Sequence, residues 1–482
     1  MSASRWWPWP NPCGYLNQYS ARVPEDHSSN YDDQADQGSP STTRQGLGPP
    51  SVVGARPAAP TPFPAPPSVR TVALISPKFA PDIGGLESHV RELAAGLTAT
   101  GHAVTVFTLA SSKVIAMSGR TGTFDGFTVR RFTLPLAAWK DIPPPEFLSH
   151  LGRELGGFDI VHAHSYHALP ALGVALLRKQ APFLLTPHYH GTGHSAKRQK
   201  LHAAYRPLGH FLMRRTDAVI AVSEAERSLL AADFGPALAA KVTVIPNGVN
   251  PARLVAPYAV DGPIVLSVGR LEPYKRVDLL IRALEVLPAS TQLVVAGDGP
   301  ARRGLEQLAV RLGVSARVRM LGFVSDSDLS RWRATASVFA TASAHEAFGL
   351  TLADALSAGL PFIASDIPAH REIAELARSA TIVHGVVPTT PGMGGTEQDA
   401  LLVHGFADAL RNVLFSGERH VATSLGHAER RQAAALSNGL WSWQEVVEAT
   451  QRLYNSLLSR PLGSEERHDR NVQLPWFNRH AG

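Results

Sequence analysis

Two series of short apolar segments, alternating with helical patterns, run through the middle of this chain. The segments of the first series are rich in β-branched residues: RTVALIS, HAVTVFT, DIVHAHS, PFLLTPH, DAVIAVS and KVTVIPN. The second series comprises PIVLSVG, TQLVVAG, ASVFATA and LPFIASD, with RVRMLGF as a shorter candidate. Strands that alternate with helices form parallel sheets with right-handed crossovers. We therefore predict an α/β fold with two parallel sheets.

The two series are separated by NGVNPARLVAPYAVDGP, residues 247–263, where proline, glycine and asparagine replace the apolar pattern. This break predicts two α/β domains, at 69–250 and 251–436. A last amphipathic pattern predicts a helix at 437–458 that packs back on the first domain. The length of 482 residues agrees, since it is too long for one ordinary core.

The two ends of the chain have a different composition. Residues 1–68 are dense in proline and glycine and predict a disordered head, and residues 459–482 predict a flexible tail. The sole cysteine, Cys13, lies in the head, which excludes a disulfide framework and a cysteine metal site in the body. The head lacks the apolar core of a signal peptide, and no segment reaches the roughly 18 apolar residues of a membrane span. We expect a cytoplasmic protein.

Basic residues are most concentrated at 196–215, and the net charge of the chain is +6. This segment lacks the regular aromatic residues of a single-strand binder, and no nucleic-acid-binding motif accompanies it. We therefore expect no nucleic-acid partner. The segment is interpreted as a solvated helix face or, alternatively, as a surface for peripheral contact with anionic lipid headgroups at the inner face of the membrane.

Two glycine-containing loops open helices at corresponding places in the two series. GRLEPYKR places Arg270 and Lys275 between a strand and a helix, and these cations beside a helix N-terminus suit a diphosphate. The alternative is two solvated loop cations. DIGG places Gly84 and Gly85 at the start of the opposing helix, where glycine permits close approach of a ligand or serves only the turn.

A third loop, HEAFGLTLAD, carries two carboxylates beside an apolar run. If a helix begins near Gly349, Glu346 lies in the loop before it and Asp354 lies more than one turn inside. The amides of Phe348, Gly349 and Leu350 are then free to donate to a ligand. Alternatively, Glu346 caps the helix and Asp354 is an ordinary surface residue.

The ordered set of motifs resembles the retaining, nucleotide-sugar-dependent glycosyltransferases of family 4, which have the GT-B fold of two facing Rossmann-like domains. The resemblance covers roughly residues 70–458. Its motifs are GGLESHV, TPHYHG, DAVIAVSEAE, VIPNGVN, GRLEPYKRVDLLIRAL, AGDGP, LGFVSDSDL, HEAFGLTLADALSAGLP and ASDIPAHREI.

The resemblance implies a role for each loop. It makes 69–250 the acceptor side and 251–436 the donor side. The counterparts of Arg270 and Lys275 hold the donor diphosphate, that of Glu346 contacts the transferred sugar, and that of Asp354 holds the ribose. The family usually has glutamate at this last position, so the shorter aspartate leaves the geometry of the ribose contact open. Further donor-binding positions implied by the resemblance are Gly84, Gly85, Val324, Phe348, Gly349 and Leu350.

Histidines cluster in VHAHS and PHYHGTGH. His-x-His spacing suits a metal, but no carboxylate or cysteine completes a set of ligands, so we predict no metal site. The resemblance instead places His188 near the donor sugar, as a catalytic residue beside Glu346, Arg270 and Lys275. It makes His164 either an acceptor-side residue or a packed structural histidine.

Asp326-Ser327-Asp328 matches the D-x-D motif that holds a metal in the other glycosyltransferase fold. Because it opens a helical pattern, we predict that Ser325 or Asp326 caps that helix.

The resemblance implies a hexosyltransferase that moves a sugar from a UDP-, GDP- or ADP-linked donor to an acceptor hydroxyl with retention. The acceptor would be a saccharide, a lipid-linked molecule or a small molecule, and no metal or other cofactor is expected. Two alternatives use the same fold: a nucleotide-sugar epimerase or hydrolase, and a non-catalytic module that binds nucleotide sugars.

Overall fold

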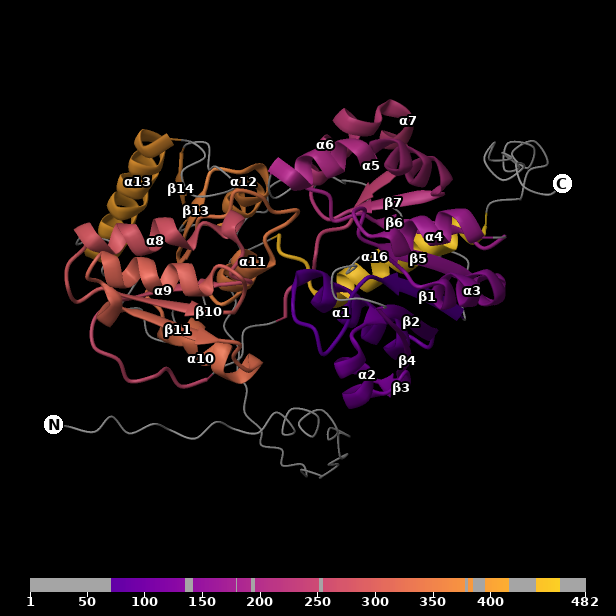
Figure 1. Ribbon diagram of the computed structural model, residues 1–482, viewed down its shortest axis with the longest axis horizontal. Helices are drawn as coiled ribbons and strands as arrows, with labels where there is room; N and C mark the ends of the chain where they lie inside the picture. Colours follow the sequence, from indigo (N-terminus) through magenta and orange to yellow (C-terminus); the bar gives the residue numbers. More distant parts are fainter. Residues whose placement is uncertain are drawn as a thin grey trace, which may run out of the picture. The chain divides into compact units, whose positions relative to one another are not determined.

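The computed structural model describes residues 71–134, 142–178, 180–191, 196–250, 255–377, 380–384, 395–415 and 439–459 (Figure 1). The predicted head and nearly all of the predicted tail lie outside these residues, so their disorder stays a prediction.

The first sheet has eight strands in the order β3-β4-β2-β1-β5-β6-β7-β8. They are β1 (Thr71–Ser76), β2 (Ala103–Ala110), β3 (Thr121–Phe124), β4 (Phe127–Thr133), β5 (Ile160–His164), β6 (Phe183–Thr186), β7 (Ala218–Ala221) and β8 (Val242–Val244). Neighbouring strands are parallel except β3 and β4, which form an antiparallel hairpin at one edge. The two parallel sheets are as predicted, and this hairpin is an addition at the edge of the first. The Asp125-Gly126 turn, with positive φ at both residues, is the hairpin signal that sequence reasoning missed.

Helices cover both faces of the first sheet. They are α1 (Gly85–Ala99), α2 (Ser112–Ser118), α3 (Pro145–Glu154), α4 (Leu169–Leu177), α5 (Ala196–Arg215), α6 (Glu224–Phe234) and α7 (Pro236–Ala239). Val72 and Leu74 of β1 pack in a core with α1, whereas Ala73 and Ile75 pack in a second core with α3 and α4. Burial on both faces explains the continuous apolar run from Val72 to Ile75 in β1.

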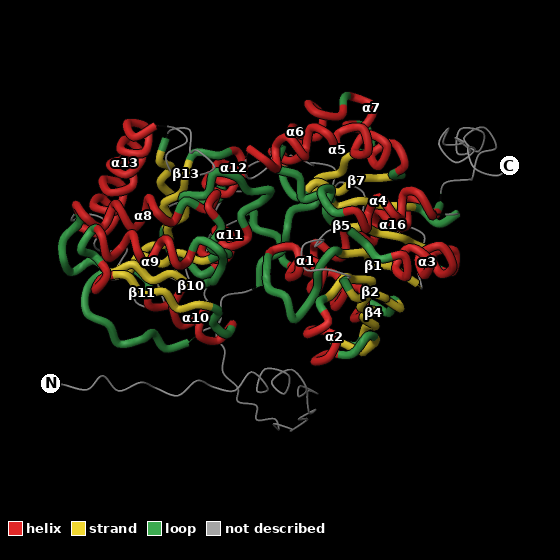
Figure 2. Tube along the Cα trace, viewed as in Figure 1, coloured by secondary structure: helices red, strands yellow, loops and turns green. Residues whose placement is uncertain are grey.

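The second sheet has six parallel strands in the order β11-β10-β9-β12-β13-β14. Figure 2 shows β10, β11 and β13 of this sheet in yellow among red helices. They are β9 (Ile264–Val268), β10 (Gln292–Ala296), β11 (Val318–Gly322), β12 (Val338–Thr341), β13 (Phe362–Ser365) and β14 (Ala380–Val383). Its helices are α8 (Val277–Ala283), α9 (Arg302–Arg311), α10 (Asp326–Thr335), α11 (Leu350–Ser357), α12 (Pro368–Glu375) and α13 (Gly395–Phe415). Helices α8, α9 and α13 share one core and α10, α11 and α12 share another, so both faces are again covered.

The last helix, α16 (Trp443–Leu458), returns to the first sheet as predicted and lies beside α1 (Figure 1). It begins with a capping box between Ser442 and Glu445. Val446, Val447 and Tyr454 share one core with α1. A Cβ at Gly96 of α1 would overlap Val447, so glycine permits this close packing.

In both sheets the strand order reverses at one point, between β1 and β5 and between β9 and β12. Open α/β sheets bind ligands at the carboxyl ends of the strands beside such a reversal. The loops after β1, β9 and β12 carry most of the predicted ligand residues.

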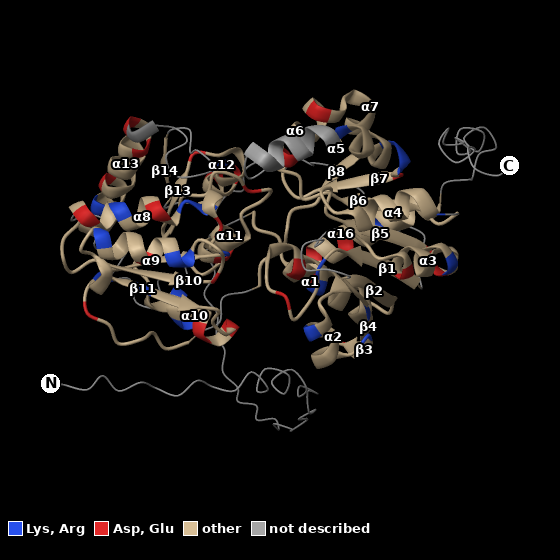
Figure 3. Cartoon of the chain, viewed as in Figure 1, with Lys and Arg blue, Asp and Glu red and all other residues tan. Residues whose placement is uncertain are grey.

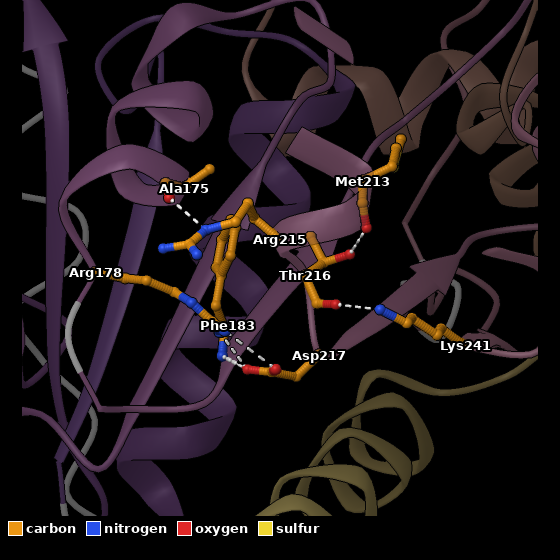
Figure 4. A network of polar contacts seen from close by, with 8 residues as sticks. All are labelled: Ala175, Arg178, Phe183, Met213, Arg215, Thr216, Asp217 and Lys241. Atoms are coloured by element: carbon orange, nitrogen blue, oxygen red, sulfur yellow. Dashed lines mark hydrogen bonds and ion pairs between the residues drawn. The ribbon is translucent and has the colours of Figure 1, made fainter. Parts of the chain in front are cut away.

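A network of charged residues lies at the amino ends of β6, β7 and β8, opposite the carboxyl ends of the strands (Figure 4). Asp217 forms an ion pair with Arg178 and accepts a hydrogen bond of 2.8 Å from the amide of Phe183. Arg215, the last residue of α5, donates to the carbonyl of Ala175, and Lys241 donates to that of Thr216. These contacts tie the ends of α5, β6 and β7 together, so the charges at this edge have a structural role.

Charge elsewhere on the body is mixed, with basic and acidic positions interspersed along α8 and α9 (Figure 3). Among the described helices, none combines the length and the apolar character needed to cross a bilayer.

Candidate active site

The loop after β9 carries three cations with different surroundings. Arg270 is 43% exposed, and its only close acid is Glu272, 3.4 Å away within the described residues. Lys275 is largely buried and points its ammonium at Glu346. The guanidinium of Arg276 is fully buried. Only the first two are placed where a ligand could meet them.

Arg276 anchors this loop and was not singled out from the sequence. Its backbone is left-handed, with φ of 48°, immediately before α8. The guanidinium donates to both carboxylate oxygens of Asp278, at 3.0 and 3.1 Å, and to Asp399 of α13 at 2.8 Å. Because it joins two helices to one loop, Arg276 fixes the backbone that presents Lys275.

Lys275 and Glu346 form an ion pair of 2.5 Å between the loops after β9 and β12, with 19% and 17% of their side chains exposed. Burial acts to lower the pKa of Lys275, but the Glu346 carboxylate outweighs it and the pKa is raised. Burial acts to raise the pKa of Glu346, but Lys275, with His370 and Ser343, outweighs it and the pKa is lowered. Both groups are therefore charged at neutral pH.

Helix α11 begins as predicted, with Gly349 as its N-cap in the left-handed region at φ of 97°. A Cβ there would lie 3.3 Å from Ile373 and 3.5 Å from His370, so glycine suits both the conformation and the space. Within the described part of the chain, the amides of Phe348 and Gly349 donate no hydrogen bond, and Leu350 opens the helix. These donors lie two to four positions after Glu346.

Asp354 lies in the second turn of α11, and the structure gives it a partner that was not predicted. Arg333 of α10 donates to its carboxylate at 2.7 Å. Burial raises the pKa of Asp354, and the Arg333 guanidinium opposes that effect. A ribose that binds here would share the carboxylate with Arg333. Val324, also predicted for the donor site, lies partly exposed between β11 and α10.

The AGDGP motif, residues 296–300, supports the loop after β9 through backbone hydrogen bonds. The amide of Leu271 donates to the carbonyl of Asp298, and the amide of Ala301 donates to the carbonyl of Leu271, both at 2.9 Å. A Cβ at Gly297 would overlap the carbonyl oxygen of Gly269. Glycine is therefore needed here for the approach of two loops.

Loops of the first sheet meet those of the second. Gly84 is the N-cap of α1, and a Cβ at Gly85 would lie 3.4 Å from Leu350 of α11. The hydroxyl of Ser223 donates to the carbonyl of Ala347 at 2.7 Å, next to Glu346. The predicted glycine loop thus adjoins the helix start that carries the predicted donor acids.

His188 and His164 lie together with a third histidine, His89 of α1, which was not predicted. Ring centroids are 5.0 Å apart for His89 and His188, and 5.3 Å apart for His89 and His164. Burial lowers the pKa of His89 to about 4 and holds those of His164 and His188 well below the ordinary value. All three imidazoles are neutral at physiological pH.

Two family models match the chain in succession: "Glycosyltransferase Family 4" over residues 83–253 and "Glycosyl transferases group 1" over residues 255–386. The glycogen synthase of Mycobacterium tuberculosis is 30% identical over 421 residues, which cover 80% of this chain and 94% of that protein. The chain belongs to glycosyltransferase family 4. A D-inositol 3-phosphate glycosyltransferase of Nocardioides is 28% identical over 441 residues, with 80% and 90% covered.

Solved structures agree with the GT-B fold of this glycosyltransferase. Sucrose-phosphate synthase from Thermosynechococcus elongatus matches with a TM-score of 0.63 and 23% identity, covering 80% of this chain and 99% of that one. Anabaena HepE in complex with UDP-glucose matches with a TM-score of 0.61 and 19% identity, with the same coverage.

Glu226 of the glycosyltransferase is a buried acid in the SEAE motif whose role sequence reasoning missed. It accepts hydrogen bonds from the amide of Tyr189 and, at 2.6 Å, from that of Val222. Burial raises its pKa to about 8, although both amides oppose that shift. Glu226 thereby joins the loops after β6 and β7 and holds the segment that follows His188, whose backbone is left-handed at φ of 49°.

The D-x-D sequence of the glycosyltransferase is a helix start, as predicted. Ser325 caps α10 by accepting from the amide of Asp328 at 3.0 Å. The carboxylate of Asp328 is also engaged, by the hydroxyls of Ser325 and Tyr258.

Proposed function

We propose that this glycosyltransferase moves a sugar from a nucleoside-diphosphate sugar to an acceptor hydroxyl with retention of configuration. The observation that carries the proposal is the Lys275–Glu346 pair beside the start of α11, at the point where the strand order of the second sheet reverses. Solved neighbours with the same fold bind UDP, UDP-glucose and ADP, which supports a nucleotide sugar as donor.

The proposed chemistry follows from charge. When the bond between the anomeric carbon and the phosphate oxygen breaks, the diphosphate gains negative charge. Arg270, Lys275 and the free amides at the start of α11 would stabilise that charge more in the transition state than in the ground state. The leaving phosphate would take the acceptor proton while the acceptor oxygen bonds to the same face of the sugar. No carboxylate nucleophile is then required, unlike in retaining glycosidases.

The remaining residues would orient the donor. Glu346 would contact the transferred sugar, Asp354 the ribose, and His188 the sugar from the side of the first sheet. The acceptor is expected to be a saccharide, a lipid-linked molecule or a small molecule. Peripheral contact of α5 with an anionic membrane at its cytoplasmic face stays part of the proposal.

A donor panel tests the proposed function. Purified protein is mixed with UDP-, GDP- and ADP-sugars, and binding is followed by thermal shift and reaction by release of the nucleoside diphosphate. We expect one nucleotide class to stabilise the protein and to be released faster when an acceptor is added. Release that is independent of acceptor would indicate a hydrolase, and an altered sugar in recovered donor would indicate an epimerase. Binding without any reaction would indicate a non-catalytic module.

The two acids should differ in their kinetic effects. We expect Glu346→Gln to lower kcat by about 10- to 10²-fold, since a hydrogen bond to a charged group contributes about 1.5–3 kcal/mol and its sugar gains positive charge. Asp354→Asn should mainly raise the donor KM, because ribose contacts are equal in both states. Steady-state kinetics with varied donor checks both effects. The opposite ranking would show that the roles of the two acids are exchanged.

A further inference from the structure

Three histidines from separate elements of the first domain, two of them buried and His188 half-buried, converge on one point. His89 comes from α1, His164 ends β5, and His188 follows β6. One ring nitrogen of each lies within 4.8 Å of the others. In each of these rings, at least one buried nitrogen has no hydrogen-bond partner among the described residues.

A hydrogen bond to Asn247 fixes the orientation of the His89 ring. Its Nδ1 lies 2.7 Å from Oδ1 of the buried Asn247, so Nδ1 carries the proton and donates. Its Nε2, which has no partner among the described residues, then carries the lone pair available to a ligand. In a histidine that binds a metal through one ring nitrogen, the other ring nitrogen usually donates its hydrogen to an oxygen acceptor.

His162 shows how a packed histidine of this strand is satisfied. It lies two residues before His164 on β5, with its ring centroid 4.3 Å from that of His164. Both of its nitrogens have partners at 2.8 Å, the hydroxyls of Tyr454 and Thr186. His164 is equally buried, yet among the residues that the structure describes neither of its nitrogens has a partner. A buried polar atom without a partner costs about 1–3 kcal/mol, so purely structural packing does not account for this cluster.

The chemistry of the three rings selects the kind of ion. Imidazole nitrogen favours zinc and the neighbouring first-row transition metals over magnesium or calcium, which prefer oxygen. Zinc binds imidazole at about 2.0–2.1 Å, so three tetrahedral ligands would be about 3.4 Å apart. From a separation of up to 4.8 Å, the ring nitrogens need to approach one another by at most about 1.4 Å, and one coordination position would remain open. The lowered pKa values leave all three imidazoles unprotonated, as ligation requires.

We propose that His89, His164 and His188 form a site for a zinc-class metal ion, and that occupation of this site inhibits the enzyme. Inhibition is expected because a His188 ring that binds the metal would no longer be available to contact the donor sugar. This second half rests on the proposed function, whereas metal binding itself does not. The site differs from a catalytic metal that neutralises diphosphate, since it lies at the histidines and not at Lys275.

Cobalt binding tests the site without any assay of activity. Full-length protein is dialysed against chelator and then titrated with Co²⁺, which gives visible absorption bands when it is four-coordinate with imidazole ligands. We expect one ion per chain, displaced by one equivalent of Zn²⁺. His89→Gln and His164→Gln should each weaken binding at least about tenfold, and Asn247→Leu should weaken it about 10- to 10²-fold. His102→Gln, in a histidine outside the cluster, should leave binding unchanged.

Circular dichroism shows which variants remain folded, and one folded variant of the three is enough to decide. A wild-type protein that gives no cobalt spectrum, or cluster variants that bind as tightly as wild type, would overturn the site.

Once a donor is known, Zn²⁺ should inhibit release of nucleoside diphosphate in proportion to occupancy of the metal site. Full activity at full occupancy would overturn the inhibitory role while leaving the metal site standing. Failure to release nucleoside diphosphate from any donor, in metal-free and metal-loaded protein alike, would count against the proposed function instead.

Discussion

Lys275→Ala is expected to lower the rate of sugar transfer by about 10²- to 10³-fold, the loss typical of removing one transition-state donor. The ammonium of Lys275 is largely buried and held 2.5 Å from Glu346. Its charge would act on the leaving diphosphate in a region screened from water, where electrostatic effects are strong. Arg270→Ala should cost a similar factor. Nucleoside diphosphate release at saturating donor measures both effects.

The Lys275 variant needs a matched control, because it leaves Glu346 partly buried without its counter-charge. Glu346→Gln alone and the double variant Lys275→Ala/Glu346→Gln complete a double-mutant cycle. The double variant should recover stability but not activity. Near wild-type turnover in a folded Lys275→Ala protein would rule out the diphosphate role.

Arg276→Met is expected to destabilise the second domain by about 3–5 kcal/mol, the cost of removing one partner from a buried ion network. The guanidinium is fully buried, and its loss removes the cation that forms ion pairs with Asp278 and Asp399. Chemical denaturation followed by fluorescence or circular dichroism measures the change. Because Arg276 acts only through the loop that carries Lys275, activity should fall only to the extent that this loop changes position.

Arg270, in the same GRLEPYKR motif as Arg276, supplies the control for this prediction. Arg270→Met removes a half-exposed cation whose nearest acid lies 3.4 Å away, so its effect on stability should stay within about 0.5 kcal/mol. Equal stabilities for the Arg270 and Arg276 variants would contradict the distinction between a ligand-facing cation and an anchoring one.

The fold was largely predictable because both faces of each sheet are buried, which gives the central strands near-continuous apolar runs. β14 was missed because it is a short edge strand that is only partly buried. The hairpin of β3 and β4 was missed because β3 is short and exposed, although its Asp-Gly turn was visible. Strand periodicity identifies central strands more readily than edges.

The candidate site was predictable in its loops but not in its contacts. Arg270, Lys275 and Glu346 follow strands whose carboxyl ends meet, so their approach could be expected from the sequence. The pairing of Asp354 with Arg333 depends on how α10 and α11 pack, and the approach of His89 to His164 depends on how α1 packs on the first sheet. Such distances are set by tertiary packing, which a single sequence does not specify.

Sugar transfer by chelated protein tests the central claim most directly, because an enzyme that uses no metal must itself supply the positive charge that stabilises the diphosphate. Protein dialysed against EDTA is assayed for nucleoside diphosphate release in excess EDTA, with the donor identified by the panel. We predict full activity, supplied by Arg270, Lys275 and the amides at the start of α11. Loss of activity that stoichiometric magnesium or manganese restores would contradict the account.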